Sequence, residues 1–167
     1  MKPNIDINEW KIIESKWDPK HQIVSESLFS IGNGRMGQRA NNEECFGGDH
    51  LQGTYIGGIY YPDKTRVGWW KNGYPDYFAK VINAVNFTGI NISINSLQLD
   101  LNIASVKAFH RELDMQHGVL KRDFQATLRN GITAKVSAQR FLSIVQDDLA
   151  IIKYEIQLEE DASIEIT

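Results

Sequence analysis

Residues 124–138 read Phe124-Gln-Ala-Thr-Leu-Arg-Asn-Gly-Ile-Thr-Ala-Lys-Val-Ser-Ala138, with apolar and polar residues alternating on both sides of Asn130-Gly131. A period of two places all the apolar side chains on one face of a strand. Asn-Gly fits a tight reversal, because both residues tolerate the positive φ that such a turn requires. The stretch therefore predicts an antiparallel β-hairpin with one buried face.

The same alternation recurs on both sides of this hairpin. Ile90, Ile92 and Ile94 are separated by polar residues, and leucines follow at every second position from 97 to 101. No long segment has the 3.6-residue period of a helix. We expect an all-β fold, an antiparallel β-sandwich of many short strands. Strands are expected at residues 54–61 (ended by Pro62), 90–94, 97–101, 124–128, 132–138, 149–158 and 163–167, and residues 63–80 are expected to be irregular. Residues 105–116 fit a strand or a short helix, and the strand is the first interpretation.

Length and composition describe an ordinary domain. The chain has 167 residues, which is enough for one domain with a core, and a net charge of −3 with scattered basic residues. That charge pattern argues against nucleic acid or an anionic membrane as a partner, and no apolar run has the length of a membrane span. Cys45 is the only cysteine, so an intrachain disulfide is excluded. No signal peptide is visible, which favours the cytoplasm, although a chain that begins after a removed leader would look the same.

Residues 26–44 contain a second turn signal. They read Glu-Ser-Leu-Phe-Ser-Ile-Gly-Asn-Gly-Arg-Met-Gly-Gln-Arg-Ala-Asn-Asn-Glu-Glu. The apolar residues Leu28, Phe29 and Ile31 lead into Gly32-Asn33-Gly34, where glycine supplies positive φ without a steric penalty. We interpret the stretch as another β-hairpin.

This stretch also resembles the signature near the N-terminus of glycoside hydrolase family 65, which contains maltose, trehalose and kojibiose phosphorylases and some hydrolases. Three later segments resemble family segments in the same order. They are Gly53-Thr-Tyr-Ile-Gly-Gly-Ile-Tyr60, Arg111-Glu-Leu-Asp-Met-Gln-His-Gly-Val-Leu120 and Arg140-Phe-Leu-Ser143.

The resemblance implies a noncatalytic domain of a larger enzyme. In the family, a large N-terminal β-sandwich (a supersandwich of the galactose-mutarotase-like kind) precedes an (α/α) barrel that holds the catalytic acid and the phosphate site. Residues 1–167 would then form an incomplete N-terminal sandwich, truncated at its C-terminal end, with the barrel absent. Its expected partners are the barrel and, for the parent enzyme, an α-linked disaccharide. Inorganic phosphate would be a co-substrate of the parent, and no cofactor is implied.

The carboxylates and histidines give no catalytic or metal-binding pattern. Neighbouring residues on a strand point to opposite faces, so adjacent carboxylates do not converge. We interpret the adjacent acidic residues as solvated loops, and the histidines lack metal-ligand spacing. The acidic groups are Glu43-Glu44, Asp147-Asp148 and Glu159-Glu160-Asp161; the histidines are His21, His50, His110 and His117.

An aromatic cluster and two arginines are the candidate contact residues. Aromatic faces bind sugar rings and anchor protein interfaces. Domain packing is the first interpretation of the cluster and sugar contact the second. Arg35 and Arg39 could face a sugar or the barrel, or could be ordinary exposed hairpin residues. The cluster consists of Trp69, Trp70, Tyr74, Tyr77 and Phe78.

Two functions therefore remain open, beside a third possibility, an unrelated β-sandwich scaffold with no sugar contact. The first is the N-terminal domain of a family 65 enzyme, which packs on the barrel and helps to shape the substrate entrance. The second is a stand-alone carbohydrate-binding module. In either case the apolar run Leu149–Leu158 would be an exposed sheet edge, and self-association through it is expected.

Overall fold

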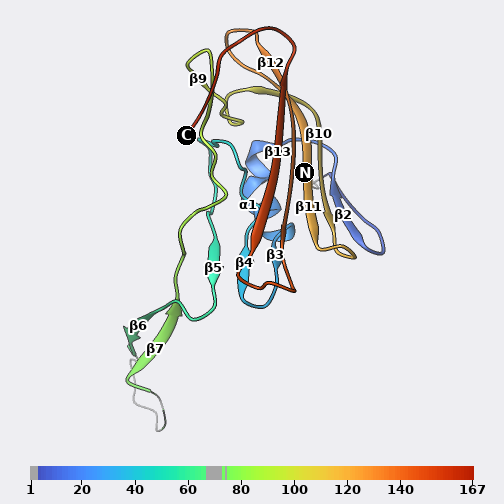
Figure 1. Ribbon diagram of the computed structural model, residues 1–167. Helices are drawn as coiled ribbons and strands as arrows, with labels where there is room; N and C mark the ends of the chain where they lie inside the picture. Colours follow the sequence, from blue (N-terminus) through green and yellow to red (C-terminus); the bar gives the residue numbers. More distant parts are fainter. Residues whose placement is uncertain (1–3, 67–72, 74) are drawn as a thin grey trace.

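Nearly all regular structure in the computed structural model is β-strand (Figure 1). The structure describes residues 4–66, 73 and 75–167. Within them no helix is long and apolar enough to cross a membrane. The elements are β1 (Ile5–Ile7), β2 (Lys11–Glu14), a 3-10 helix (Pro19–His21), α1 (Gln22–Leu28), β3 (Ile31–Gly32), β4 (Met36–Gln38), β5 (Thr54–Ile56), β6 (Tyr60–Lys64), β7 (Tyr77–Val81), β8 (Ile92–Ile94), β9 (Leu97–Gln98), β10 (Ser105–Asp114), β11 (Val119–Thr127), β12 (Thr133–Leu142), β13 (Ala150–Leu158) and β14 (Ile164–Ile166).

The largest sheet is antiparallel and has the strand order β1-β2-β10-β11-β12-β13. The predicted hairpin at Asn130-Gly131 joins β11 to β12, with Phe124 opposite Val136 and Thr127 opposite Thr133. Gly131 has the positive φ of +89° that the turn requires. The two strands and their turn are confirmed where the alternation predicted them.

A second layer covers the inner face of this sheet. It consists of the three-stranded sheets β14-β8-β9 and β3-β4-β5 with α1 and the loops between them. Trp17 packs between the two layers, with its ring centroid 5.7 Å from that of Phe46 and 5.1 Å from that of Phe109. The expected all-β sandwich is therefore confirmed. The main core cluster contains Phe46, Ile92, Ile94, Leu99, Leu101, Phe109, Phe124, Ala126, Leu128, Ile132, Ala134 and Val136.

The second predicted hairpin is shorter than expected. Residues 31–38 form it, but Gln22–Leu28 is a helix, so Leu28 does not belong to the approaching strand. The helix follows a 3-10 turn in which the Asp18 carboxylate accepts a hydrogen bond from Lys20 N–H. The buried face of α1 carries Gln22, Ser25 and Glu26. Because these side chains are polar, the helix has no apolar periodicity to detect.

The strand predicted for residues 54–61 was wrong in its extent. It is divided into β5 and β6, and Gly58 between them has a φ of +89°. Pro62 does not end the strand but lies within β6, which is possible because a two-stranded hairpin has open edges where no N–H is needed. β7, apart from Val81, falls in the region expected to be irregular and pairs with β6. Figure 1 shows this pair as an arm that projects from the sandwich.

Candidate functional site

The Gly32-Asn33-Gly34 turn is held to a distant loop by one side chain. Asn33 Oδ1 accepts hydrogen bonds from the backbone N–H groups of Arg35 (3.0 Å) and Met36 (2.7 Å). Its Nδ2 donates to the carbonyl oxygens of Ser143 (2.7 Å) and Asp147 (3.0 Å) in the β12–β13 loop. Two of the segments quoted for the family resemblance therefore meet here, and Asn33 acts as a clamp between them.

The positive φ in this turn belongs to Gly34 alone, at +89°. A Cβ on Gly34 would meet no heavy atom within 4 Å, whereas one on Gly32 would lie 3.3 Å from the Met36 carbonyl oxygen. Gly34 is therefore required for its backbone conformation and Gly32 for space. The expectation that both glycines share the left-handed conformation was wrong for Gly32.

The two candidate arginines do different things. Arg35 is exposed on the turn, with its guanidinium 3.9 Å from the Asp147 carboxylate. Arg39 donates from Nε to the Leu51 carbonyl (2.9 Å) and from Nη2 to Ser27 Oγ (2.7 Å) and the Ile23 carbonyl (3.1 Å). Arg39 thus fixes α1 to the loop that precedes β5. Trp69, Trp70 and Tyr74 lie outside the described residues.

Three buried arginines form a ladder across the inner face of the main sheet. Arg111 on β10, Arg122 on β11 and Arg140 on β12 are each 4% exposed or less. Arg122 binds both Glu43 and Glu44, and its Nη2 lies 2.8 Å from Glu44 Oε2. The arginine ladder therefore neutralises carboxylates supplied by the opposite layer.

The outer members of the ladder complete the contact. Arg140 donates from Nη2 to the Asn41 carbonyl (2.9 Å), and its Nη1 lies 3.5 Å from Glu43. Arg111 Nη1 lies 3.1 Å from Glu14 Oε2, and Arg111 Nη2 donates to Gln22 Oε1 (3.1 Å). The ladder consequently ties three strands to residues 41–44 and to α1.

Glu43 and Glu44 were expected in a solvated loop, and that expectation was wrong. They are only 4% and 3% exposed. The segment that carries them forms no strand, so its neighbouring side chains are not forced to opposite faces, and both reach one guanidinium. Asp147-Asp148 and Glu159-Glu160-Asp161 are exposed, as expected.

The pKa shifts in this cluster of buried arginines and glutamates fit a structural role. Burial raises the pKa of Glu43, but the charges of Arg122 and Arg140 outweigh burial and hold that pKa below its usual value. Burial lowers the pKa of Arg111 to about 10, partly offset by Glu14. Burial raises the pKa of Tyr154, whose hydroxyl donates to Glu44 Oε2 at 3.1 Å. A general acid needs a raised pKa, so Glu43 is unsuited to that role.

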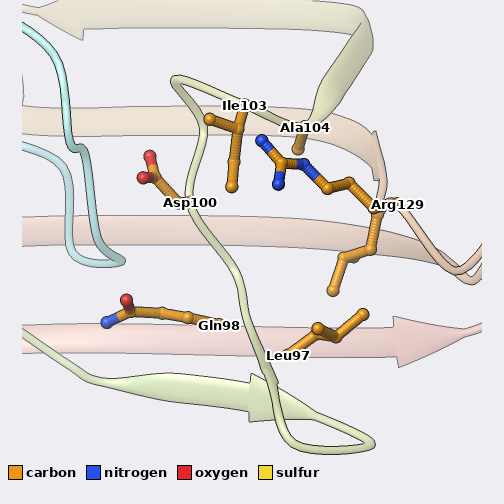
Figure 2. A pocket seen from close by; sticks show the side chains of 7 residues that line it. Leu97, Gln98, Asp100, Ile103, Ala104 and Arg129 are labelled. Atoms are coloured by element: carbon orange, nitrogen blue, oxygen red, sulfur yellow. The ribbon is translucent and has the colours of Figure 1, made fainter.

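Two hollows lie beside carboxylate side chains. The first, of about 130 Å³, is lined mainly by Leu97, Ile103, Ala104, Leu128 and Arg129. Figure 2 shows the Asp100 carboxylate directed away from the Arg129 guanidinium. That carboxylate accepts from the backbone N–H groups of Gly47 (3.0 Å) and Asn102 (2.8 Å). The first hollow therefore holds no acid/base pair.

The second hollow, of about 240 Å³, is polar and lies beside Glu26 and residues 41–46. Its carboxylates are already engaged, since Glu26 accepts from Gln22 Nε2 (3.1 Å) and from Leu51 N–H (2.8 Å). Among the residues that the structure describes, no group of His, Cys, Asp or Glu could hold a metal ion. The carboxylates of the second hollow thus serve contacts within the domain.

The arginine ladder could have been found in the sequence. Arg122 follows Leu120 and precedes Phe124 at a spacing of two, and Arg140 lies in the same way between Ala138 and Leu142. Extending the period-two pattern to these two positions would have placed both arginines on the buried face. The partners of Arg122, which are 78 and 79 residues away, could not be assigned from that pattern.

Fold and site together describe an all-β domain whose two layers are joined by buried arginine–carboxylate contacts. Comparison with known proteins identifies the family. Residues 12–167 match "Glycosyl hydrolase family 65, N-terminal domain", and the chain belongs to that family.

Three relatives illustrate the similarity. The chain is 46% identical over 150 residues to "Maltose phosphorylase" of Bacillus subtilis (strain 168), covering 90% of this chain and 20% of the relative. It is 27% identical over 151 residues to "Kojibiose phosphorylase" of Halothermothrix orenii, covering 90% of this chain and 18% of the relative. The solved structure "Putative kojibiose phosphorylase from human microbiome" matches with a TM-score of 0.87 and 31% identity, covering 99% of this chain and 22% of that one. The chain thus spans about a fifth of the length of these relatives.

Proposed function

We propose that this chain is the noncatalytic N-terminal domain of an inverting disaccharide phosphorylase that acts on maltose. The observation that carries the proposal is the 46% identity to a maltose phosphorylase, against 27% to a kojibiose phosphorylase and 26% to a trehalose phosphorylase. Inorganic phosphate is the co-substrate of the complete enzyme. The domain packs on the catalytic barrel and helps to shape the substrate entrance.

The described residues support a scaffolding role. Chemistry at a glycosidic bond needs an acid with a raised pKa. The buried carboxylates here are paired with arginine or hydrogen-bonded, and the lowered pKa of Glu43 keeps it ionised. In this proposal the general acid and the phosphate site lie in the barrel, as the family resemblance implies. The N-terminal domain contributes rigid surfaces, such as the loop that Asn33 holds.

Activity of the complete gene product tests the proposal. The coding sequence is followed beyond residue 167, and the expressed protein is incubated with maltose, kojibiose or trehalose, with and without phosphate. We expect phosphate-dependent release of glucose 1-phosphate from maltose. Glucose release independent of phosphate would identify a hydrolase instead, and a reading frame without the helical barrel would overturn the proposal.

The isolated chain is the control for a noncatalytic role. We expect residues 1–167 to release no product with or without phosphate. Product formation that survives repurification and is abolished by a point mutation in this chain would refute that role. Calorimetric heat of maltose binding to the isolated chain, lost in Trp69→Ala, would favour the stand-alone carbohydrate-binding module.

A further inference from the structure

The arm formed by β6 and β7 has two chemically different faces. Residues directly opposite each other in an antiparallel pair project to the same face. The register pairs Tyr60 with Val81, Pro62 with Ala79 and Lys64 with Tyr77. This set of six, here called the apolar face, contains one charged residue.

The other face is polar at its centre. It carries Tyr61, Asp63, Phe78 and Lys80, and Asp63 forms an ion pair with Lys80. An ion pair tolerates water, so this face is suited to solvent. The two faces of the same two strands therefore differ in charge. The apolar face has Lys64 as its one charged residue, whereas the other face carries an ion pair.

The apolar face is left open to water. Tyr60 is 52% exposed, Tyr77 59% and Val81 57%. β6 and β7 form a sheet of their own with two strands. A two-stranded hairpin is only marginally stable in water unless something packs against it. The arm projects from the sandwich (Figure 1), and its apolar face thus calls for a covering surface.

We propose that the apolar face of the arm docks on the catalytic domain of the same polypeptide. The inference rests on the proposed function, because it takes a catalytic domain to follow this chain. The length of the relatives indicates which domain covers the face. This chain matches only about a fifth of each relative, so about four-fifths of such a protein lies outside the matched region. A domain tethered to this chain has a high effective concentration at the arm, which favours it over a second copy.

The composition of the face suits such an interface. Tyrosine is enriched at the centres of interfaces, where its ring loses water and its hydroxyl can still find a partner. Tyr60 and Tyr77 lie on this face, whereas the Asp63–Lys80 ion pair lies on the other. The docked arm therefore buries the apolar face and leaves the ion pair at the solvated rim.

Photo-crosslinking of the complete gene product tests this inference with a matched pair of positions. Tyr60 and Tyr61 are neighbours of the same type, similarly exposed at 52% and 58%, on opposite faces. Each is replaced singly by p-benzoyl-phenylalanine, an aromatic side chain that an exposed position accepts. After illumination, crosslinked peptides are identified by mass spectrometry. We expect crosslinks from position 60 to the catalytic domain of the same chain, several-fold above those from position 61.

Three results would overturn the inference. Crosslinks from position 60 that join two chains would assign the face to a second copy. Equal yields from the two positions would show no preferred face. Absence of crosslinks from position 60, with p-benzoyl-phenylalanine at position 81 equally silent, would show that the face is open to water. Intrachain crosslinks in a protein that does not phosphorolyse maltose would leave the docking intact and reject only the proposed substrate.

Discussion

At the scale of single residues, Asn33 makes the Gly32-Asn33-Gly34 turn a tertiary contact as well as a chain reversal. The side chain satisfies two N–H groups within its own turn and two carbonyl groups in a loop that is 110 and 114 residues away. A tight turn alone needs only the backbone conformations. The asparagine amide is needed because it has both a donor and an acceptor end.

Replacing Asn33 should separate these two roles. Asn33→Ala removes all four hydrogen bonds, and since the site is partly exposed we expect a loss of about 1–3 kcal/mol in the free energy of unfolding. Asn33→Asp keeps the acceptors for Arg35 and Met36 but loses the donors to Ser143 and Asp147, so it should recover only part of the loss. Urea denaturation measures both. Full stability in Asn33→Ala would contradict the clamp.

Gly34 and Gly32 should differ in their tolerance of a side chain. Gly34→Val places a β-branched residue at a φ of +89°, and we expect it to cost about 1–3 kcal/mol. Gly32→Val brings its Cβ to 3.3 Å from the Met36 carbonyl oxygen and to 3.9 Å from Gly37 Cα, without a positive φ, and should cost less. Thermal melting midpoints of the two variants provide the measurement. Unchanged midpoints in both would count against the turn geometry.

At the scale of elements, the arginine ladder joins the main sheet to the second layer. Removing one partner from a buried ion pair is expensive because the other charge remains desolvated. The ladder therefore fixes residues 41–44 and α1 against β10, β11 and β12. Apolar contacts alone would define the relative position of the two layers less precisely, because they are not directional.

The lowered pKa of Glu43 predicts a loss of stability in acid. Because the folded pKa lies below the unfolded value of about 4.3, its contribution is complete above that value and is lost as the pH falls through the folded pKa. We expect the urea midpoint to fall as the pH is lowered below the unfolded value of about 4.3. The fall should be smaller in Glu43→Gln, which cannot titrate. Parallel pH profiles of the two proteins would contradict the prediction.

At the scale of the whole molecule, β13 is an edge strand of the six-stranded sheet. An edge carries unpaired N–H and C=O groups that can pair with another chain. Its outward side chains include the charged Lys153 and Glu155 but also the half-exposed Ile151. The position of β13 agrees with the expectation from sequence that this run forms an edge, and self-association through it stays a prediction.

We expect the purified chain to associate through β13. Light scattering at increasing protein concentration should show species larger than the monomer. Ile151→Lys adds a further charge to the edge and should reduce association, because charged residues protect edge strands. A monodisperse monomer at high concentration, with cooperative unfolding, would show that the described chain closes on itself.

The sequence by itself determined the β-hairpin at Asn130-Gly131, the long strands after residue 105 and the family. Period-two alternation and turn chemistry are local properties, so they can be read without knowing which segments meet. For the same reason α1 was missed, because its buried face is polar and gives no local signal.

Only the tertiary structure decided which residues meet. It buried Glu43 and Glu44 against Arg122, linked Asn33 to the β12–β13 loop and set the two faces of the arm. These features depend on contacts between residues far apart in the chain, such as the 78 residues between Glu44 and Arg122. A buried carboxylate and a solvated one look alike in a sequence, because the difference lies in the charge that the fold brings to it.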